Sequence, residues 1–372
     1  TNGFYLPFEQ DYTVEGFSTV VYEGNGASSH YIGGTGFTPD LVWIKERTDN
    51  GSHQLIDSVR GVTKRLESNG TGAETVISNG LLSFEPDGFT YGDYANGNEN
   101  GIDNVAWSWD MGGTTASNTN GSITSSVRAN TTYGQSIVRA TYSGSGTQTF
   151  GHGLGAAPDL IIGKAEDHAY GWGVYHSGLS SPETKNLSLN TTAAAATSSA
   201  WGNTLPTSSV FSVNIGNLED AGYPVIFYCF SSVTGYSKFG SYSGSGSSGN
   251  AITTGFTPAF VMVKNTTVAQ GWVMVDNTRS PTNPANLILE ANDSSAESAY
   301  GTANRNIDFD ANGFTIKTTA AGGTTALNAS GNTYIYAAFA DTREYAYWYD
   351  QSGNNNDWTS EGGLTESDVM LD

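Results

Sequence analysis

The sequence predicts an all-β protein of three tandem antiparallel β-sandwich domains, each of about 100 residues, with almost no helix. The 372 residues carry three copies of one pattern, and a third of this length suits a sandwich that buries its own core. The 47 glycines lie in short clusters between β-branched and aromatic runs, as in strands joined by tight turns. Residues 58–68 and 193–200 hint at helical turns, but both are too short or too polar for core helices.

The strand that defines each copy follows a proline that stands six residues before a lysine. Proline cannot donate to a sheet ladder and so suits the residue before a strand. The apolar residues that follow predict a strand buried on both faces, and the lysine is expected to carry its charge out to water. The three copies are residues 36–45, 155–164 and 255–264, which end at Lys45, Lys164 and Lys264.

Other positions repeat in the same register. A Tyr-x-Gly-x-Gly run precedes each proline, at Tyr22, Tyr142 and Tyr242. Twelve residues after the lysines stand Asp57, His176 and Asp276. A later strand opens on Phe89, Phe211 or Phe314, and each copy closes on a buried aromatic strand at 104–109, 225–230 or 334–339.

These repeats divide the chain into six segments. They are an N-terminal arm or linker (1–15), three sandwich repeats (16–113, 134–232 and 233–342), a Ser/Thr/Asn-rich linker (114–133) and an aromatic, Asn-rich segment (343–372). The linker has Ile123 and Val127 as its apolar anchors and is expected to add one edge strand. Its length predicts looser coupling between the first and second repeats than between the second and third.

Composition restricts the classes of partner. With 36 acidic and 15 basic residues the net charge is −21, which disfavours nucleic acid because phosphates require clustered Lys and Arg. No apolar run is long enough to predict a membrane span, and the lone Cys229 cannot form an internal disulfide. The chain begins Thr1-Asn2-Gly3 without methionine, so we expect it to be a segment of a longer polypeptide.

The residues give little indication of catalysis, and we expect neither enzyme activity nor a cofactor. The five histidines lack the spacing of zinc ligands. Arg60 could act with Asp57 or Glu74 in a catalytic site, but a salt bridge that pins the loop of residues 53–74 is favoured.

Two weaker binding hypotheses concern sugars and calcium. Trp172, Trp201 and Trp272 lie near Gly- and Asn-rich turns and could stack on sugars. Because Trp172 and Trp272 recur eight residues after the lysine, a shared core position is the favoured alternative. Calcium ligands would come from the carboxyl-terminal segment, where an Asx-rich turn is the favoured alternative. They are Asp350, Asn354, Asn356 and Asp357.

The repeated motifs resemble the repeated domain of tail-fibre and virion structural proteins of aquatic tailed phages, commonly cyanophage-like. The resemblance is carried by Tyr-x-Gly-x-Gly and by the runs 36–45, 57–61, 87–90 and 105–109. Residues 349–357 and 367–372 resemble the start of a further module similar to laminin-G or concanavalin-like lectin domains. The second repeat departs from this pattern, with His176 for aspartate and Ser209-Val210-Phe211 for Asp-Gly-Phe-Thr.

This resemblance implies a non-enzymatic subunit of a phage fibre, located on the virion, that acts as a rigid spacer and host-contact scaffold. Its expected partners are copies of itself, in a trimer or helical stack, other virion proteins and a host-surface glycan. One alternative is a carbohydrate-binding adhesin module. Another is a self-assembling extracellular filament whose residues 1–15 are donated as a strand to the next protomer.

Overall fold

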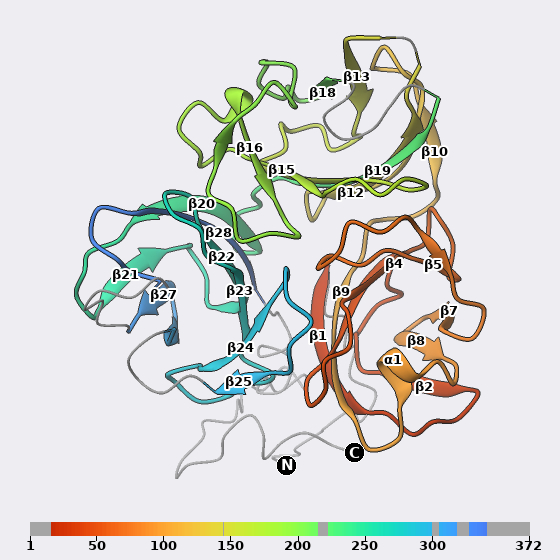
Figure 1. Ribbon diagram of the computed structural model, residues 1–372, viewed down its shortest axis with the longest axis vertical. Coiled ribbons are helices and arrows are strands. Elements are labelled where there is room, and N and C mark those ends of the chain that lie inside the picture. Colours follow the sequence, from red (N-terminus) through yellow and green to blue (C-terminus); the bar gives the residue numbers. More distant parts are fainter. Residues whose placement is uncertain (1–15, 144, 215–221, 300–304, 318–326, 341–372) are drawn as a thin grey trace, which may run out of the picture.

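The protein is an all-β structure of antiparallel sheets, as the sequence predicts (Figure 1). The computed structural model describes residues 16–143, 145–214, 222–299, 305–317 and 327–340. Within these ranges, helix is limited to the short turns α1 (Ala95–Asn98) and η1 (Pro182–Thr184). A membrane-crossing helix, long and apolar enough for a bilayer, does not occur among the described residues.

The first repeat is a sandwich of an inner and an outer sheet. The inner sheet has the order β1-β9-β3-β4 and the outer sheet β2-β8-β7, with a separate ribbon of β5 and β6. The inner strands are β1 (Phe17–Glu23), β3 (Leu41–Glu46), β4 (Gln54–Asp57) and β9 (Asp103–Trp109). The others are β2 (His30–Gly33), β5 (Lys64–Arg65), β6 (Thr75–Val76), β7 (Leu81–Glu85) and β8 (Gly88–Tyr91).

The second repeat has the same plan with a wider inner sheet, whose order is β10-β11-β12-β19-β14-β15-β16-β17. The linker supplies two of its strands, β10 (Ala116–Asn118) and β11 (Ser125–Asn130), whereas the sequence predicts one. The remaining inner strands are β12 (Gln135–Thr141), β14 (Leu160–Ala165), β15 (Gly173–His176), β16 (Lys185–Ser188), β17 (Ala196–Thr197) and β19 (Pro224–Phe230). The outer pair is β13 (Thr147–Gly151) and β18 (Val210–Asn214).

The third repeat returns to the plan of the first, with an inner sheet β20-β28-β22-β23-β24-β25 and an outer sheet β21-β27-β26. The inner strands are β20 (Ser237–Ser243), β22 (Pro258–Asn265), β23 (Trp272–Asp276), β24 (Leu287–Glu290), β25 (Ser298–Ala299) and β28 (Thr333–Ala340). The outer strands are β21 (Asn250–Thr253), β26 (Ile307–Asp310) and β27 (Gly313–Ile316).

The strand after each proline is buried along its whole length, which confirms the prediction of burial on both faces. Alternate side chains of a strand point to opposite faces. In β3, Val42 and Ile44 face the core of their own sandwich, while Leu41 and Trp43 face a second cluster. The strands β14 and β22 divide their side chains in the same way between a sandwich core and the second cluster.

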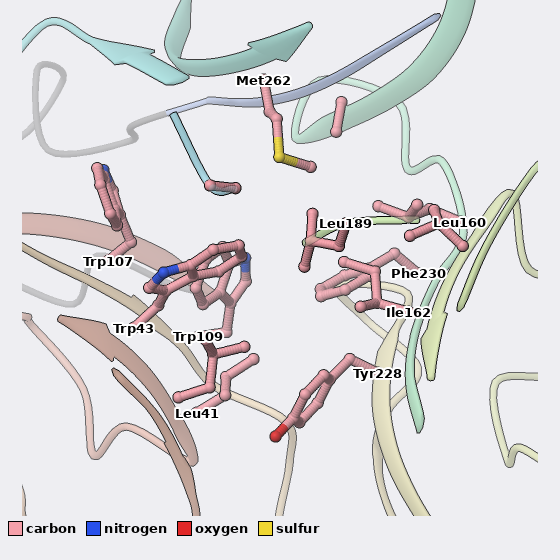
Figure 2. Packing of buried hydrophobic residues seen from close by; sticks show 14 of the residues in the cluster. Leu41, Trp43, Trp107, Trp109, Leu160, Ile162, Leu189, Tyr228, Phe230 and Met262 are labelled. Atoms are coloured by element: carbon pink, nitrogen blue, oxygen red, sulfur yellow. The ribbon is translucent and has the colours of Figure 1, made fainter. Parts of the chain in front are cut away.

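This second cluster is a core shared by all three repeats. The inner sheets face one another around a common centre, and their inward side chains interleave there (Figures 1 and 2). Phe339 lies among rings from each repeat, with centroid distances of 5.0 Å to Phe17, 5.8 Å to Trp109 and 5.7 Å to Phe230. The expectation that the first and second repeats are coupled more loosely than the second and third is therefore wrong, because all three contribute to one core.

The lysines that end the repeated strands correct a second expectation. Lys45, Lys164 and Lys264 are fully buried rather than exposed to water. Lys45 Nζ donates to the carbonyls of Glu46 (2.5 Å) and Asp49 (3.1 Å), and the other two ammonium groups likewise donate to backbone carbonyls. These bonds replace water, while burial lowers the pKa of Lys45 and of Lys264 to about 8.

Truncating the centre of the shared core should destabilise the whole molecule. Phe339→Ala removes a ring that is packed against all three repeats, so we expect a loss of about 3–5 kcal/mol in the free energy of unfolding. Urea unfolding followed by tryptophan fluorescence and by circular dichroism measures this loss. The control Val76→Ala, at a position 63% exposed, should change the free energy by less than about 0.5 kcal/mol. Equal effects of the two substitutions would contradict a shared core.

Candidate functional site: the contacts between the repeats

The tryptophans proposed to stack on sugars lie in the interior. Trp172, Trp201 and Trp272 are each 1% exposed, so no indole face is open to a sugar ring in this structure. Trp201 packs in the core of the second sandwich against Tyr175. Trp172 and Trp272 occupy equivalent places in the shared core, as the favoured alternative proposed.

The proposed calcium ligands, Asp350, Asn354, Asn356 and Asp357, lie outside the described residues. In the part of the chain that the structure describes, no group of three or more His, Cys, Asp or Glu side chains is placed to hold a metal ion.

The buried tryptophans instead form part of a ring of hydrogen bonds between repeats. Trp172 Nε1 donates to the Glu67 carbonyl at 2.8 Å, and Trp272 Nε1 donates to the Ser188 carbonyl at 2.9 Å. The first repeat has His53 at this position, and its Nε2 lies 3.0 Å from the Glu290 carbonyl. The three acceptors also occupy equivalent positions, since each comes directly after a buried leucine of its own repeat. Each repeat thus bonds to the preceding one, and the first bonds to the third.

The geometry around His53 fixes its tautomer. Trp43 Nε1 donates to His53 Nδ1 at 2.8 Å, so Nε2 carries the proton and donates to Glu290. Burial, assisted by the nearby Lys45 charge, lowers the pKa of His53 to about 3. The imidazole is therefore neutral near pH 7 and replaces the indole of the other repeats as a single N–H donor.

A second ring starts from Asp57, His176 and Asp276. Asp57 Oδ2 accepts from Tyr228 Oη at 2.9 Å, and Asp276 Oδ2 accepts from Trp107 Nε1 at 3.1 Å. The strand register places Ala337 of the third repeat at the position of these two donors.

His176 compensates for the donor that Ala337 lacks. Its Nδ1 accepts from the Gly178 N–H at 3.0 Å, so Nε2 donates to the Tyr336 carbonyl, also at 3.0 Å. The histidine that breaks the repeat pattern therefore suits the group that it contacts. An aspartate at this position would place its carboxylate oxygens against a carbonyl oxygen, and neither group could donate a hydrogen bond.

A third ring consists of backbone bonds. The N–H groups of Glu74, Ala195 and Glu297 donate to carbonyls of the following repeat at 2.5, 3.1 and 2.6 Å. The acceptors are Glu166, Thr266 and Arg47, each two residues after a buried lysine. The buried lysines thus lie beside the turns that present these carbonyls.

Two of the three interfaces also contain a buried ionic network. Arg60 Nε lies 2.5 Å from Asp57, and its Nη1 lies 3.2 Å from Glu74, which confirms the salt-bridge interpretation of Arg60. Burial alone would lower the pKa of Arg60, but the neighbouring Asp57 and Glu74 charges more than offset this and raise it. In the third repeat, Arg279 lies 2.6 Å from Asp276 and 2.8 Å from Glu297.

In the second repeat, all three residues of this network are replaced together. It has His176, Leu179 and Ala195 at the positions of the acid, the arginine and the glutamate. All three charged groups are absent together, so no buried charge is left without a partner. The sequence signal for this network was the Asp-x-x-Arg spacing at 57–60 and 276–279, which sequence reasoning passed over in the third repeat.

Breaking one ionic network should be costly. Arg60→Leu installs the side chain that the second repeat uses but leaves Asp57 and Glu74 without their buried partner. We expect a loss of about 3–5 kcal/mol in the free energy of unfolding, measured by urea titration at pH 7. Lys185→Leu, which removes an exposed bond to Thr197, should cost less than about 0.5 kcal/mol. A loss below about 1 kcal/mol for Arg60→Leu would contradict the role of the network.

Acid should weaken the contact made by His176. Burial lowers its pKa from 6.5 to about 4, against the smaller opposing influences of the Tyr336 carbonyl and the nearby Asp159. Between these pH values the unfolded chain binds a proton that the folded chain does not, so stability falls as the pH falls.

The test compares wild type with His176→Gln, which cannot titrate, by urea unfolding at pH 4.5, 5.5 and 7. Relative to the variant, wild type should lose about 2.5 kcal/mol on going from pH 7 to pH 4.5. The slope with pH is the readout, so a constant cost of the substitution does not affect it. Identical slopes would show that His176 is not held neutral.

Comparison with known proteins agrees with treating the three repeats as one unit. No curated protein matches the chain significantly. One family model, described as a domain of unknown function (DUF7483), matches residues 13–343 and so runs through all three repeats. The chain therefore belongs to the DUF7483 family.

Proposed function

We propose that this chain is a non-enzymatic structural protein of a virion, a subunit of a tail fibre or other phage fibre. In this proposal it serves as a rigid spacer and host-contact scaffold. The observation that carries the proposal is the closed ring of inter-repeat contacts, in which the polar side chains at the repeated positions bind neighbouring repeats. The phage-fibre part of the proposal rests on the resemblance of the repeated motifs.

Rigidity follows from the way the repeats close on one another. Each repeat contacts both others through the shared core and through backbone bonds, as between Glu74 and Glu166 and between Glu297 and Arg47. Bending the chain between two repeats would break these contacts and open a close-packed core. Such a block suits an element that must hold a tip away from a particle.

The arrangement also restricts how copies of the chain would meet. The inward faces of the three inner sheets are already covered within one molecule. A trimer or helical stack of copies, or a contact with other virion proteins, would therefore use the outward sandwich faces or the ends. The net charge of −21 would keep such a block soluble before assembly.

Locating the chain in its native source tests the proposal. An antibody raised against residues 203–209, an exposed turn that includes Leu205, should label purified particles in immunogold electron microscopy. Peptides of the chain should co-purify with particles through a density gradient, with a major capsid protein as the positive control. The fibre proposal would be overturned if the chain were found in free filaments or only in the host-cell fraction.

A further inference from the structure

A polar cleft opens where the first repeat meets the linker. It has a volume of about 530 Å³ and lies between the chain that leaves β9 and the strand β11. Asp110 comes from the first side, and Arg128 and Asn130 come from β11. This volume is in the range of small-molecule sites.

The floor of the cleft is a built structure. Asp40 is 2% exposed and accepts from Ser58 Oγ at 3.0 Å and from the Met111 N–H at 3.0 Å. Arg128 Nε lies 2.8 Å from Asp40 Oδ1 and donates to the Gly112 carbonyl at 2.8 Å. Asp40 is thus fully used in holding the arginine and the chain after β9.

The walls of the cleft, in contrast, carry polar atoms that no other described residue engages. The Nη groups of Arg128 are donors without an acceptor among the described residues. Asp110 uses Oδ1 to accept from the Gly112 N–H at 2.7 Å, which leaves Oδ2 open. Asn130 uses its Oδ1 to accept from the Tyr133 N–H and leaves Nδ2 open. Thr38 and Thr131 also line the cleft.

The mixture of these atoms indicates the class of ligand. Donors of Arg128 and Asn130 lie in one cleft with the acceptor of Asp110, and hydroxyls of threonine can serve as either. A ligand hydroxyl both donates and accepts, so a ring with several hydroxyls can use both kinds of group. An anion would meet the Asp110 carboxylate, and a cation would meet the Arg128 guanidinium.

The cleft is not a by-product of the repeat. At the places of Thr38 and Asp110, the second repeat has Ala157 and Ser231, and it has Val233 where Gly112 stands. There the chain turns back at once, since the Val233 N–H donates to the Ser237 carbonyl. The inserted linker strand is what creates the cleft in the first repeat.

We propose that this cleft binds a neutral polyhydroxylated ligand, such as a saccharide unit, through Arg128, Asp110 and Asn130. The binding site is distinct from the buried tryptophans. The proposal of a saccharide site does not depend on the fibre proposal, because it is argued from the cleft alone.

Binding to the isolated full-length chain provides the test. Saturation-transfer NMR and calorimetry would screen neutral mono- and oligosaccharides, with inorganic phosphate and calcium chloride as the anion and cation probes. We expect at least one saccharide to bind. Asp110→Asn keeps an oxygen for the Gly112 N–H but turns the open acceptor into a donor, so affinity should fall about tenfold or more.

The matched control is Asp93→Asn, an exposed acid bonded to Asn79, which should leave affinity unchanged. Equal unfolding midpoints of wild type and Asp110→Asn would show that the fold is intact. The proposal is overturned if no saccharide binds, if phosphate or calcium binds the cleft instead, or if Asp110→Asn binds as wild type does. Particle labelling is a separate result, so this proposal and the fibre proposal can fail independently.

Discussion

The hydrogen bonds that join each repeat to both others, and so close into a ring, define this molecule. Each repeat presents the same positions to its neighbours, and the third repeat completes the circle by contacting the first through Trp107 and Arg47. Heterologous contacts that close after three units leave no unpaired inward surface. Here the closure occurs within one chain, so a triangular block with a common core replaces a row of separate sandwiches.

The three interfaces share one geometry but differ in chemistry. Two use an acid, an arginine and a glutamate, whereas the third uses His176, Leu179 and Ala195. Apolar residues can replace a buried ionic network when all of its members change together. The side chain at each interface also complements the group that it contacts. An aspartate accepts a hydrogen bond from Tyr228 or Trp107, and the histidine donates to the backbone carbonyl that precedes Ala337. We infer that these pairings distinguish the correct neighbour from the wrong one.

Sequence reasoning located the strands because the proline, the apolar run that follows it and the aromatic strand that closes each repeat recur at the same relative positions. It could not show what covers the second face of each inner sheet, because a buried pattern does not identify its partner. The rule that lysine reaches water failed at Lys45, where the turn after the strand offers backbone carbonyls in place of water. Recurrence at one repeat position indicated the core role of Trp172 and Trp272. The cleft was missed because Arg128 lies in a segment whose composition is that of a solvated linker, and only the fold places it beside Asp40.

Small-angle X-ray scattering of the full chain tests closure most directly, because it measures size without perturbing any contact. A single compact unit of this length should have a radius of gyration of about 21 Å. Three sandwiches in a row, each with a radius of gyration of about 13 Å, would give a value close to 30 Å and an elongated distance distribution. The first result is the one that the closed ring predicts, and the second would contradict it.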